Sequence, residues 1–264
     1  MKKVLALILA CVMLTSCMLF SCGEEKTIVV GYTIYAPMNY KDDSGKLVGF
    51  DTELAEKVFG NLGYKVIFQE IKWENKYTDL NGKTIDCIWN GFTANSADDD
   101  GKQRSEKVDF SYNYMENQQV VVVKKGSGIT SAANLAARIL AAEKGSAGES
   151  YAKKTFVSAL AVKGFTKQTD CLIEVKSGAV AAAILDVQLA RSYVGKGDYA
   201  DLEIVEGISS DPEFYAIGFR KGSELTAQVN AELEKLAADG TIKALAEKYN
   251  LGNAAITDFA DQKK

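Results

Sequence analysis

Several aromatic, polar and small residues lie close to the points where the predicted strands of this sequence end. The segments 27–32, 65–71 and 86–92 are rich in β-branched and aromatic residues, which is typical of buried strands in an α/β protein. In open α/β sheets, ligands bind beyond the carboxyl ends of the strands. The residues that we expect to contact a ligand there are Tyr35, Trp73, Asn90, Gly91, Thr93, Arg104, Ser146 and Asp186.

The chemical types in this set suit a zwitterion. Arg104 can hold a carboxylate through two parallel hydrogen bonds, and Asp186 can pair with an ammonium group. The ring of Tyr35 or Trp73 can cover an apolar or cationic side chain. The sequence has no His, so it lacks the usual general base, the usual zinc ligand and a Ser-His-Asp triad.

Five of these residues also have a purely structural explanation. Tyr35 and Trp73 could be core aromatics, and Asp186 could cap a helix. Ser146 could only form a turn, and Asn90 could end a strand by bonding its own backbone. The sequence leaves these alternatives open.

The segment TANSADDDGKQRSEKVDF, residues 93–110, joins three consecutive acidic residues to a basic half. A calcium-binding loop needs ligands at alternating positions and a distant bidentate Glu. Asp98, Asp99 and Asp100 are consecutive, and Glu106 stands one position too close to Gly101. We therefore expect a solvated loop here and no metal site.

The composition limits the classes of partner. The 264 residues carry a formal net charge of −4 with a pI near 5.2, so a nucleic-acid partner is not expected. Beyond residue 22 only Cys87 and Cys171 remain, each in a mainly apolar run. A disulfide between them could form in an oxidising compartment, but two buried thiols are the simpler prediction.

The first 26 residues, MKKVLALILACVMLTSCMLFSCGEEK, predict export. Two Lys precede an apolar run from Val4 to Phe20, as in a secretory signal peptide, although a transmembrane anchor is the alternative. The segments ending at Cys17 and at Cys22 both resemble the lipobox of bacterial lipoproteins. We prefer Cys22, because the mature chain would then begin with the polar tether CGEEK. The prediction is an extracytoplasmic protein, lipid-anchored to the cell membrane after cleavage of residues 1–22.

The remaining chain alternates between apolar strands and amphipathic helices, which predicts an α/β fold. The first series runs from residue 27 to about residue 118, and a second begins in the Ala-rich segment 131–154. That segment could be one long helix, or two helices around a short strand at 138–143. Two late helices, within 223–251, are expected to return to the first unit. The predicted division is 1–22 signal peptide, 23–118 and 214–264 lobe 1, and 119–213 lobe 2.

Five segments between about Val29 and Leu251 together resemble a known family. They are YAPMNYKDDSGKLVGFDTELAEKV, IKWENKYTDLNGKTIDCIWNGFTA, RSEKVDFSYNYM, ILD and AELEKLAADGTIKALAEKYN. The sequence resembles the extracytoplasmic solute-binding proteins of ABC importers for polar amino acids (bacterial extracellular solute-binding family 3), in particular the lipoproteins that bind cystine or amino acids generally.

The resemblance implies a fold and a set of partners. The fold is the two-lobed, type II periplasmic-binding-protein fold, with a two-strand hinge near residues 118–121 and 215–219 and a ligand cleft between the lobes. The implied protein is a monomer without cofactor or enzymatic activity. Its implied partners are an amino acid or cystine, the permease of an ABC transporter, and the membrane through its N-terminal lipid.

The resemblance also implies roles for individual residues. Arg104 would bind the α-carboxylate of the ligand, and Asp186 would bind its α-ammonium group. The remaining groups would be backbone groups around the carboxylate, at Gly91, Thr93 and Ser146, and aromatic rings beside the ligand side chain, at Tyr35 and Trp73.

The sequence departs from the family pattern most clearly before Arg104. The family usually places its Arg five positions after the Thr, whereas Arg104 follows Thr93 by eleven positions. About six residues are therefore inserted within 94–103, and they could displace Arg104 from the site. In the second unit, Ala147 also stands where the family commonly has a hydroxyl residue.

Two other functions stay open. The same fold occurs in cyclohexadienyl dehydratases, which act on prephenate or arogenate, and Glu143, Glu149 or Asp186 could supply the acid for such a reaction. The predicted lipoprotein signal points away from biosynthesis. A lipid-anchored sensor that binds the same ligand without a transporter is the other alternative.

Overall fold

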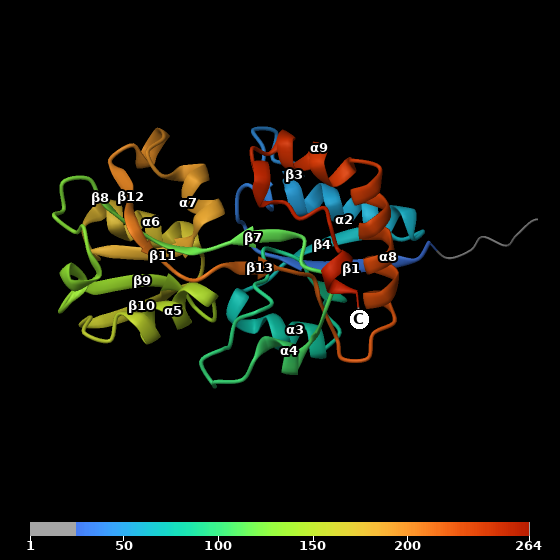
Figure 1. The fold of residues 1–264 in the computed structure, drawn as a ribbon, viewed down its shortest axis with the longest axis horizontal. Helices are drawn as coiled ribbons and strands as arrows, with labels where there is room; N and C mark the ends of the chain where they lie inside the picture. Colours follow the sequence, from blue (N-terminus) through green and yellow to red (C-terminus); the bar gives the residue numbers. More distant parts are fainter. Residues whose placement is uncertain (1–24, 264) are drawn as a thin grey trace, which may run out of the picture.

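The structure, a computed structural model, describes residues 25–263 and has two α/β lobes (Figure 1). Each lobe is built on one five-stranded sheet with helices packed against it. This arrangement confirms the predicted two-lobed α/β fold. The predicted signal peptide and Cys22 lie outside the described residues.

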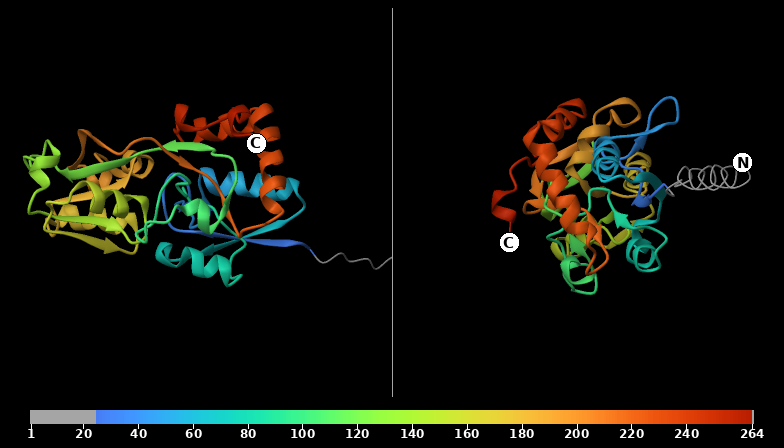
Figure 2. Two further views of the ribbon diagram at one scale, coloured as in Figure 1. Left: turned by 60° about the horizontal axis from the view of Figure 1, so that its bottom comes forward. Right: turned by 90° about the vertical axis from the view of Figure 1, so that its right-hand side faces the viewer.

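The first lobe has a sheet in the order β4-β1-β5-β14-β6. β1 runs parallel to β4 and β5, whereas β14 runs antiparallel to β5 and β6. The late helices α8 and α9 return to this lobe and pack beside α2, as predicted (Figure 2). The elements are β1 (Thr27–Tyr32), β2 (Tyr40–Lys41), β3 (Leu47–Val48), α2 (Phe50–Asn61), β4 (Lys65–Glu70), α3 (Lys76–Asn81), β5 (Cys87–Ile88), α4 (Arg104–Lys107), β6 (Asp109–Phe110), β14 (Gly218–Phe219), α8 (Leu225–Ala238) and α9 (Thr241–Lys248).

The second lobe has a sheet in the order β10-β9-β11-β8-β12. β9 runs parallel to β10 and β11, and β8 runs antiparallel to β11 and β12. The Ala-rich segment is not one helix, because β9 separates the short 3-10 turn Ala132–Leu135 from α5. The elements are β8 (Gln119–Lys124), β9 (Ile139–Glu143), α5 (Ala147–Thr155), β10 (Ala161–Phe165), α6 (Gln168–Ser177), β11 (Ala182–Asp186), α7 (Val187–Tyr193) and β12 (Leu202–Ser209).

Two short antiparallel strands connect the lobes, β7 (Met115–Asn117) and β13 (Glu213–Tyr215). In Figure 1 they cross side by side between the two lobes. The expected crossing positions, 118–121 and 215–219, were therefore wrong by a few residues. The reason is pairing: residues from Gln119 onward already belong to the ladder of the second sheet, and Gly218 and Phe219 belong to the first.

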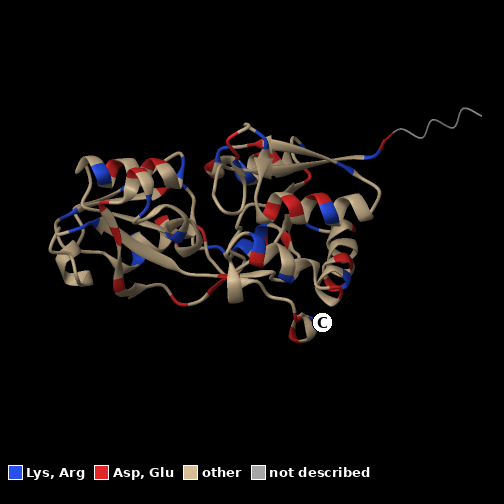
Figure 3. Cartoon of the chain, turned by 90° about the horizontal axis from the view of Figure 1, so that it is seen from above, with Lys and Arg blue, Asp and Glu red and all other residues tan. Residues whose placement is uncertain are grey.

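Acidic and basic residues are both spread over the two lobes (Figure 3). In that view, the Lys and Arg positions are interspersed with the Asp and Glu positions along both lobes, as the small formal charge of −4 leads one to expect. Among residues 25–263, no helix combines the length and the apolar character needed to cross a membrane.

The two described cysteines are buried free thiols in different lobes. Cys87 lies in β5 of the first sheet, and Cys171 lies in α6 of the second lobe. Burial raises the pKa of both thiols, so neither has the thiolate character of a reactive cysteine.

Candidate ligand-binding site

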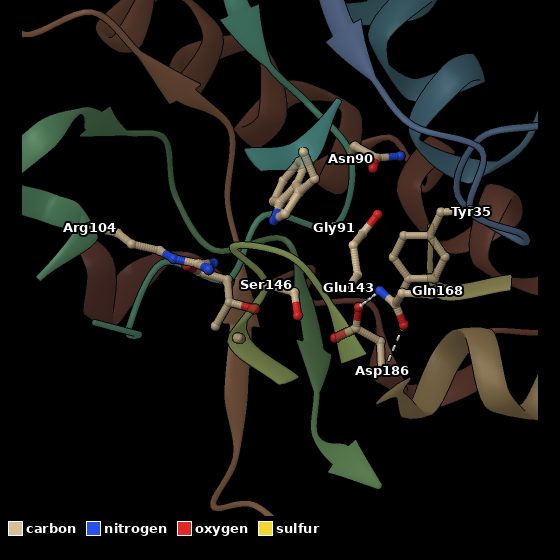
Figure 4. A pocket seen from close by; sticks show the side chains of 11 residues that line it. Tyr35, Asn90, Gly91, Arg104, Glu143, Ser146, Gln168 and Asp186 are labelled. Carbon is tan, nitrogen blue, oxygen red and sulfur yellow. Dashed lines mark hydrogen bonds between the residues drawn. The ribbon is translucent and has the colours of Figure 1, made fainter. Parts of the chain in front are cut away.

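One cavity between the lobes is lined by all eight predicted site residues (Figure 4). Five of them lie after β1 and β5 or in the 3-10 turn Trp73–Asn75, and Arg104 begins α4. The second lobe supplies the rest from the carboxyl ends of β9 and β11 and from the first residues of α5 and α6. The lining residues are Tyr35, Trp73, Asn90, Gly91, Thr93, Arg104, Glu143, Ser146, Ala147, Gln168 and Asp186.

Arg104 is 1% exposed, and its guanidinium faces the cavity. Its Nε donates to Asp98 Oδ1 at 3.0 Å, Nη1 donates to the Thr93 carbonyl at 3.2 Å, and Nη2 donates to the Gly145 carbonyl at 3.2 Å. The side chain also stacks on Phe92, with 5.1 Å between the guanidinium carbon and the ring centre. These described contacts occupy three of its five N–H donors, which leaves one on each terminal nitrogen for a ligand.

The inserted segment before Arg104 folds back on itself, so it does not displace Arg104. Ala97 forms a β-bridge with Gln103, and the Asp98 N–H donates to the Lys102 carbonyl at 3.0 Å. The Arg104 N–H then donates to the Ser96 carbonyl at 3.0 Å. The two ends of the inserted loop are therefore close together, and the chain on either side keeps its course.

Asp98, inside the insertion, holds the guanidinium in place. Its carboxylate accepts hydrogen bonds from Arg104, from Lys107 Nζ at 2.8 Å and from the Tyr77 hydroxyl at 2.7 Å. Burial alone would raise the pKa of Asp98, but the Arg104 charge and the Lys107 and Tyr77 hydrogen bonds outweigh it and lower that pKa to about 2. The insertion thus adds an anion that orients Arg104.

The three consecutive Asp side chains point to different partners. Asp98 binds Arg104, Asp99 pairs with Lys153 of α5 at 2.5 Å, and Asp100 pairs with Lys107 at 2.9 Å. Their carboxylates are therefore engaged with cations of the chain. Within residues 25–263, no group of three or more acidic or Cys residues converges in the way a metal ion requires.

Asp186 is the last residue of β11 and is 6% exposed. It occupies the position before α7, but its side chain does not cap that helix. Asn117 Nδ2 and Gln119 Nε2 donate to its Oδ1, each at 2.6 Å, and Gln168 Nε2 donates to its Oδ2. Burial raises the pKa of Asp186, although these three amides favour the ionised form. A cation in the cavity would complete the site.

Ser146 both caps α5 and lines the cavity. Its Oγ accepts a hydrogen bond from the Glu149 N–H at 3.0 Å, so the predicted turn is a helix N-cap. The N-terminus of α5 lies next to Arg104, whose Nη2 donates to the Gly145 carbonyl, and Figure 4 shows Ser146 on this side of the cavity. A helix N-terminus and a guanidinium both favour an anion, so this side of the cavity is suited to a carboxylate.

Tyr35 and Trp73 are core residues and cavity walls at the same time, with 3% and 5% exposure. The Tyr35 hydroxyl lies 2.6 Å from that of Tyr215, and Trp73 packs edge-on against Phe92. Their rings are therefore fixed before any ligand arrives.

Gly91 does not contribute as the resemblance implies, and Asn90 lines the cavity while bonding to other parts of the first lobe. The Gly91 N–H donates to Asp51 Oδ2 at 2.9 Å, so this N–H is not available to a carboxylate. A side chain at Gly91 would come within 2.6 Å of the Tyr35 ring, and its φ of +56° favours glycine. The Asn90 amide donates to Asn39 Oδ1 and to the Thr33 carbonyl, at 2.7 and 2.9 Å, so it fixes the loop after β1.

The sequence-based prediction of binding residues missed three residues at the cavity. Glu143 and Gln168 line the cavity, and Lys76 lies beside it with 2% exposure. Lys76 Nζ donates to the Gly145 carbonyl of the second lobe at 2.9 Å. Burial, followed by the Arg104 charge, lowers the pKa of Lys76 to about 7. Glu143 ends β9, so the rule that ligands bind at carboxyl ends of strands would have found it.

The lobes are closed on each other in this structure. Arg104 and Lys76 reach across to Gly145 from the first lobe. At the rim, Asp99 accepts hydrogen bonds from Lys153 and from Ser150 Oγ of α5, and Lys167 pairs with Glu70 at 2.7 Å. The buried contacts surround the cavity, and the ion pairs lie outside it.

The comparisons with known proteins agree with this geometry. The model of the bacterial extracellular solute-binding proteins, family 3, matches residues 28–252. The arginine-binding extracellular protein ArtP of Bacillus subtilis (strain 168) is 30% identical over 96% of this chain and 99% of its own length. The L-cystine-binding protein TcyA of the same organism is 30% identical, over 81% of this chain and 77% of its own.

A solved structure shows the same fold. It is an ABC uptake transporter substrate-binding protein from Streptococcus pneumoniae with bound histidine, with 30% identity and a TM-score of 0.78. The match covers 87% of this chain and 94% of that chain. All three relatives are named as binding proteins. The chain belongs to the bacterial extracellular solute-binding proteins, family 3.

Proposed function

We propose that this protein captures a free amino acid, polar or cystine, between its two lobes and delivers it to the permease of an ABC importer. The observation that carries the proposal is the placement of Arg104 and Asp186. A cation held by the first lobe and an anion held by the second face one cavity, with fixed aromatic rings beside them. The relatives named for arginine, cystine and histidine support amino acids as the ligand class.

The lining residues form three regions of the cavity, one for each part of the ligand. The ligand α-carboxylate takes the two remaining N–H donors of Arg104 and the N-terminus of α5 at Ser146. The α-ammonium pairs with Asp186. The ligand side chain lies along Tyr35 and Trp73.

Ligand contacts from both lobes favour the closed form, because only a difference in affinity between open and closed forms can drive closure. We propose that the lobes are residues 23–118 with 214–264, and 119–213. The strands β7 and β13 would then absorb the motion between them.

The inserted loop is expected to prolong the closed state. Asp99 reaches α5 of the second lobe, whereas Asp100 pairs with Lys107 inside the first lobe. An exposed ion pair contributes up to about 1 kcal/mol and Asp99 also accepts the Ser150 hydroxyl, so Asp99→Asn should raise the ligand dissociation rate by up to about fivefold. Stopped-flow fluorescence of Trp73, which lines the cavity, would measure this rate.

Asp100→Asn is the matched control for the Asp99 substitution. It removes the same charge from the same loop without touching the second lobe, and it should leave the dissociation rate within about 1.5-fold. Equal rates for the two variants would show that the contact between Asp99 and Lys153 does not hold the lobes together.

The anchoring and the partners are part of the same proposal. A lipid on Cys22 would keep the extracytoplasmic, monomeric protein at the membrane, where the permease accepts the ligand from it. The sequence motif at residues 19–22 supports this attachment. A sensor without a transporter would share the site, and the neighbouring genes would separate it from an importer.

A dehydratase of this fold is the enzymatic alternative. Of its three candidate acids, Glu149 is engaged, because it accepts the Gly145 N–H at 2.7 Å and pairs with Lys153 at 3.0 Å. Asp186 and Glu143 face the cavity. A turnover assay with prephenate and arogenate tests this alternative directly, and we expect no product.

A thermal-shift screen with the twenty amino acids and cystine tests binding. Protein that has been unfolded and refolded to remove retained ligand should be stabilised by a micromolar ligand at 1 mM by about 4 kcal/mol. For a chain of this size, that corresponds to a rise in Tm on the order of 10 °C. No rise with any member of the panel would contradict the proposal.

A further inference from the structure

Glu143 is a buried carboxylate that faces the cavity without a partner. It is the last residue of β9, it is 4% exposed, and it lines the cavity together with Asp186 (Figure 4). Within residues 25–263, its carboxylate takes part in no ion pair, and the Gln168 amide beside it donates to Asp186 instead. An unpaired buried carboxylate is costly, so a group that enters the cavity is the natural partner.

The neighbours of Glu143 do not supply that partner. Asp186 on β11 and Asp170 on α6 add negative charge around it. Lys76 on α3 is the nearby cation, but its Nζ donates to the Gly145 and Trp73 carbonyls. The Gln168 amide is close enough to lower the pKa of Glu143, but its Nε2 donates to Asp186. Burial, followed by the charge of Asp186, raises that pKa well above its usual value.

The charges of an ordinary amino acid do not satisfy this cavity. The ligand carboxylate pairs with Arg104 and the ligand ammonium pairs with Asp186. No charged group of the ligand then remains to pair with Glu143. A second positive charge on the ligand would pair with Glu143. That charge would also lie beside the faces of Tyr35 and Trp73, which attract cations.

We infer that the site selects an amino acid whose side chain carries a positive charge, and that Glu143 binds that charge. The inference rests on the proposed function and adds the ligand class to it. The ligands that fit are L-amino acids ending in a guanidinium or an ammonium group. The competing arrangement is that Glu143 and Asp186 share the α-ammonium, in which case the charge of the ligand side chain would not matter.

Calorimetric titration with paired ligands separates these two arrangements. L-Arginine and L-citrulline have nearly the same shape but differ in charge, and L-norleucine keeps the aliphatic chain of L-lysine without its terminal ammonium group. The wild-type protein should bind at least one charged member about 30-fold or more tightly than its neutral counterpart. Glu143→Gln keeps the shape but removes the charge, and it should reduce that ratio to about threefold or less.

Proton release gives a second readout that does not depend on affinity. Burial raises the pKa of Glu143 and a cation bound beside it would lower that pKa again, so binding of a charged ligand should release protons from this group. Titrations in phosphate and in Tris should show that arginine releases up to one proton more than citrulline does. Asp186 faces the α-ammonium of both ligands, so its contribution cancels in this difference, and Glu143→Gln, which keeps Lys76, separates the contribution of Glu143 from that of Lys76. Glu143→Gln should abolish this difference.

Glu203→Gln is the matched control, because Glu203 is an exposed residue of β12 in the same lobe and outside the cavity. It should keep the wild-type ratio and the proton difference. Equal wild-type affinity for the charged and neutral members of both pairs would overturn the inference, even if Glu143→Gln failed to fold. Tight binding of neutral amino acids or cystine would then leave the proposed function standing, whereas binding of no amino acid would overturn both.

Discussion

Arg104→Ala is expected to weaken amino-acid binding at least about 100-fold, which corresponds to about 2.7 kcal/mol. The guanidinium is almost completely buried and is held by Asp98 and by two carbonyl groups, one from each lobe. Removing it leaves the ligand carboxylate without its charged partner in a site that excludes water, and such truncations cost 2–5 kcal/mol or more. Calorimetric titration of the variant would measure the loss.

Two further variants show whether the loss comes from the binding contact. Arg104→Lys keeps the charge but not the planar pair of donors, so its affinity should lie between those of the wild type and Arg104→Ala. Arg138→Ala removes an exposed arginine of the second lobe and should bind normally. Asp98 keeps Lys107 and Tyr77 as partners in Arg104→Ala, so the fold should survive. An unchanged affinity would place the ligand carboxylate elsewhere.

Asp186→Asn is expected to weaken binding about 30- to 100-fold. Three side-chain amides donate hydrogen bonds to this carboxylate, and the NH2 group of the new Asn would face these donors without an acceptor. The substitution also removes the negative charge that pairs with the α-ammonium. A ligand whose amine is acetylated should bind the wild type and the variant about equally weakly. Asp198→Asn, an exposed change in the same lobe, should have no effect.

The pH dependence provides an independent check on Asp186. Burial raises the pKa of Asp186 above that of an exposed Asp, so on acidification Asp186 gains a proton at a higher pH than an exposed Asp would. Only the ionised form pairs with an ammonium, so affinity should decrease as the pH falls through that raised pKa. Asp186→Asn should lose this part of the dependence. The same decrease in the variant would assign it to another group.

The positions of the eight predicted residues follow from a simple rule. Carboxyl ends of parallel strands meet at one edge of a sheet, so residues after β1 and β5 had to come together in the first lobe and residues after β9 and β11 in the second, and closure of the lobes brings the two edges together. Arg104 was in doubt because sequence spacing alone does not show whether an insertion closes on itself. The bridge between Ala97 and Gln103 and the bond from Asp98 to Arg104 are tertiary features that keep it in the cavity.

Other features could not be found from the pattern of residues. The apolar run Val120–Val123 is as compatible with a hinge strand as with a sheet strand, so the crossing strands were placed too late in the chain. An Asp at the start of a helical segment is typical of an N-cap, but Gly49 takes that place in α2 and Asp51 accepts a hydrogen bond from the Gly91 N–H instead. The role of Glu143 depends on the absence of a partner, which only side-chain positions reveal.

The central claim is that one amino acid is held between the lobes by its carboxylate and its ammonium group. The most direct test is calorimetric titration of ligand-stripped protein with the twenty amino acids and cystine, followed by the α-amide and the N-acetyl derivative of the tightest ligand. We predict one site per chain with a Kd of about 1 μM or below, and at least about 100-fold weaker binding of either derivative. No binding by any of these ligands, or derivatives that bind as tightly as the parent amino acid, would contradict the account.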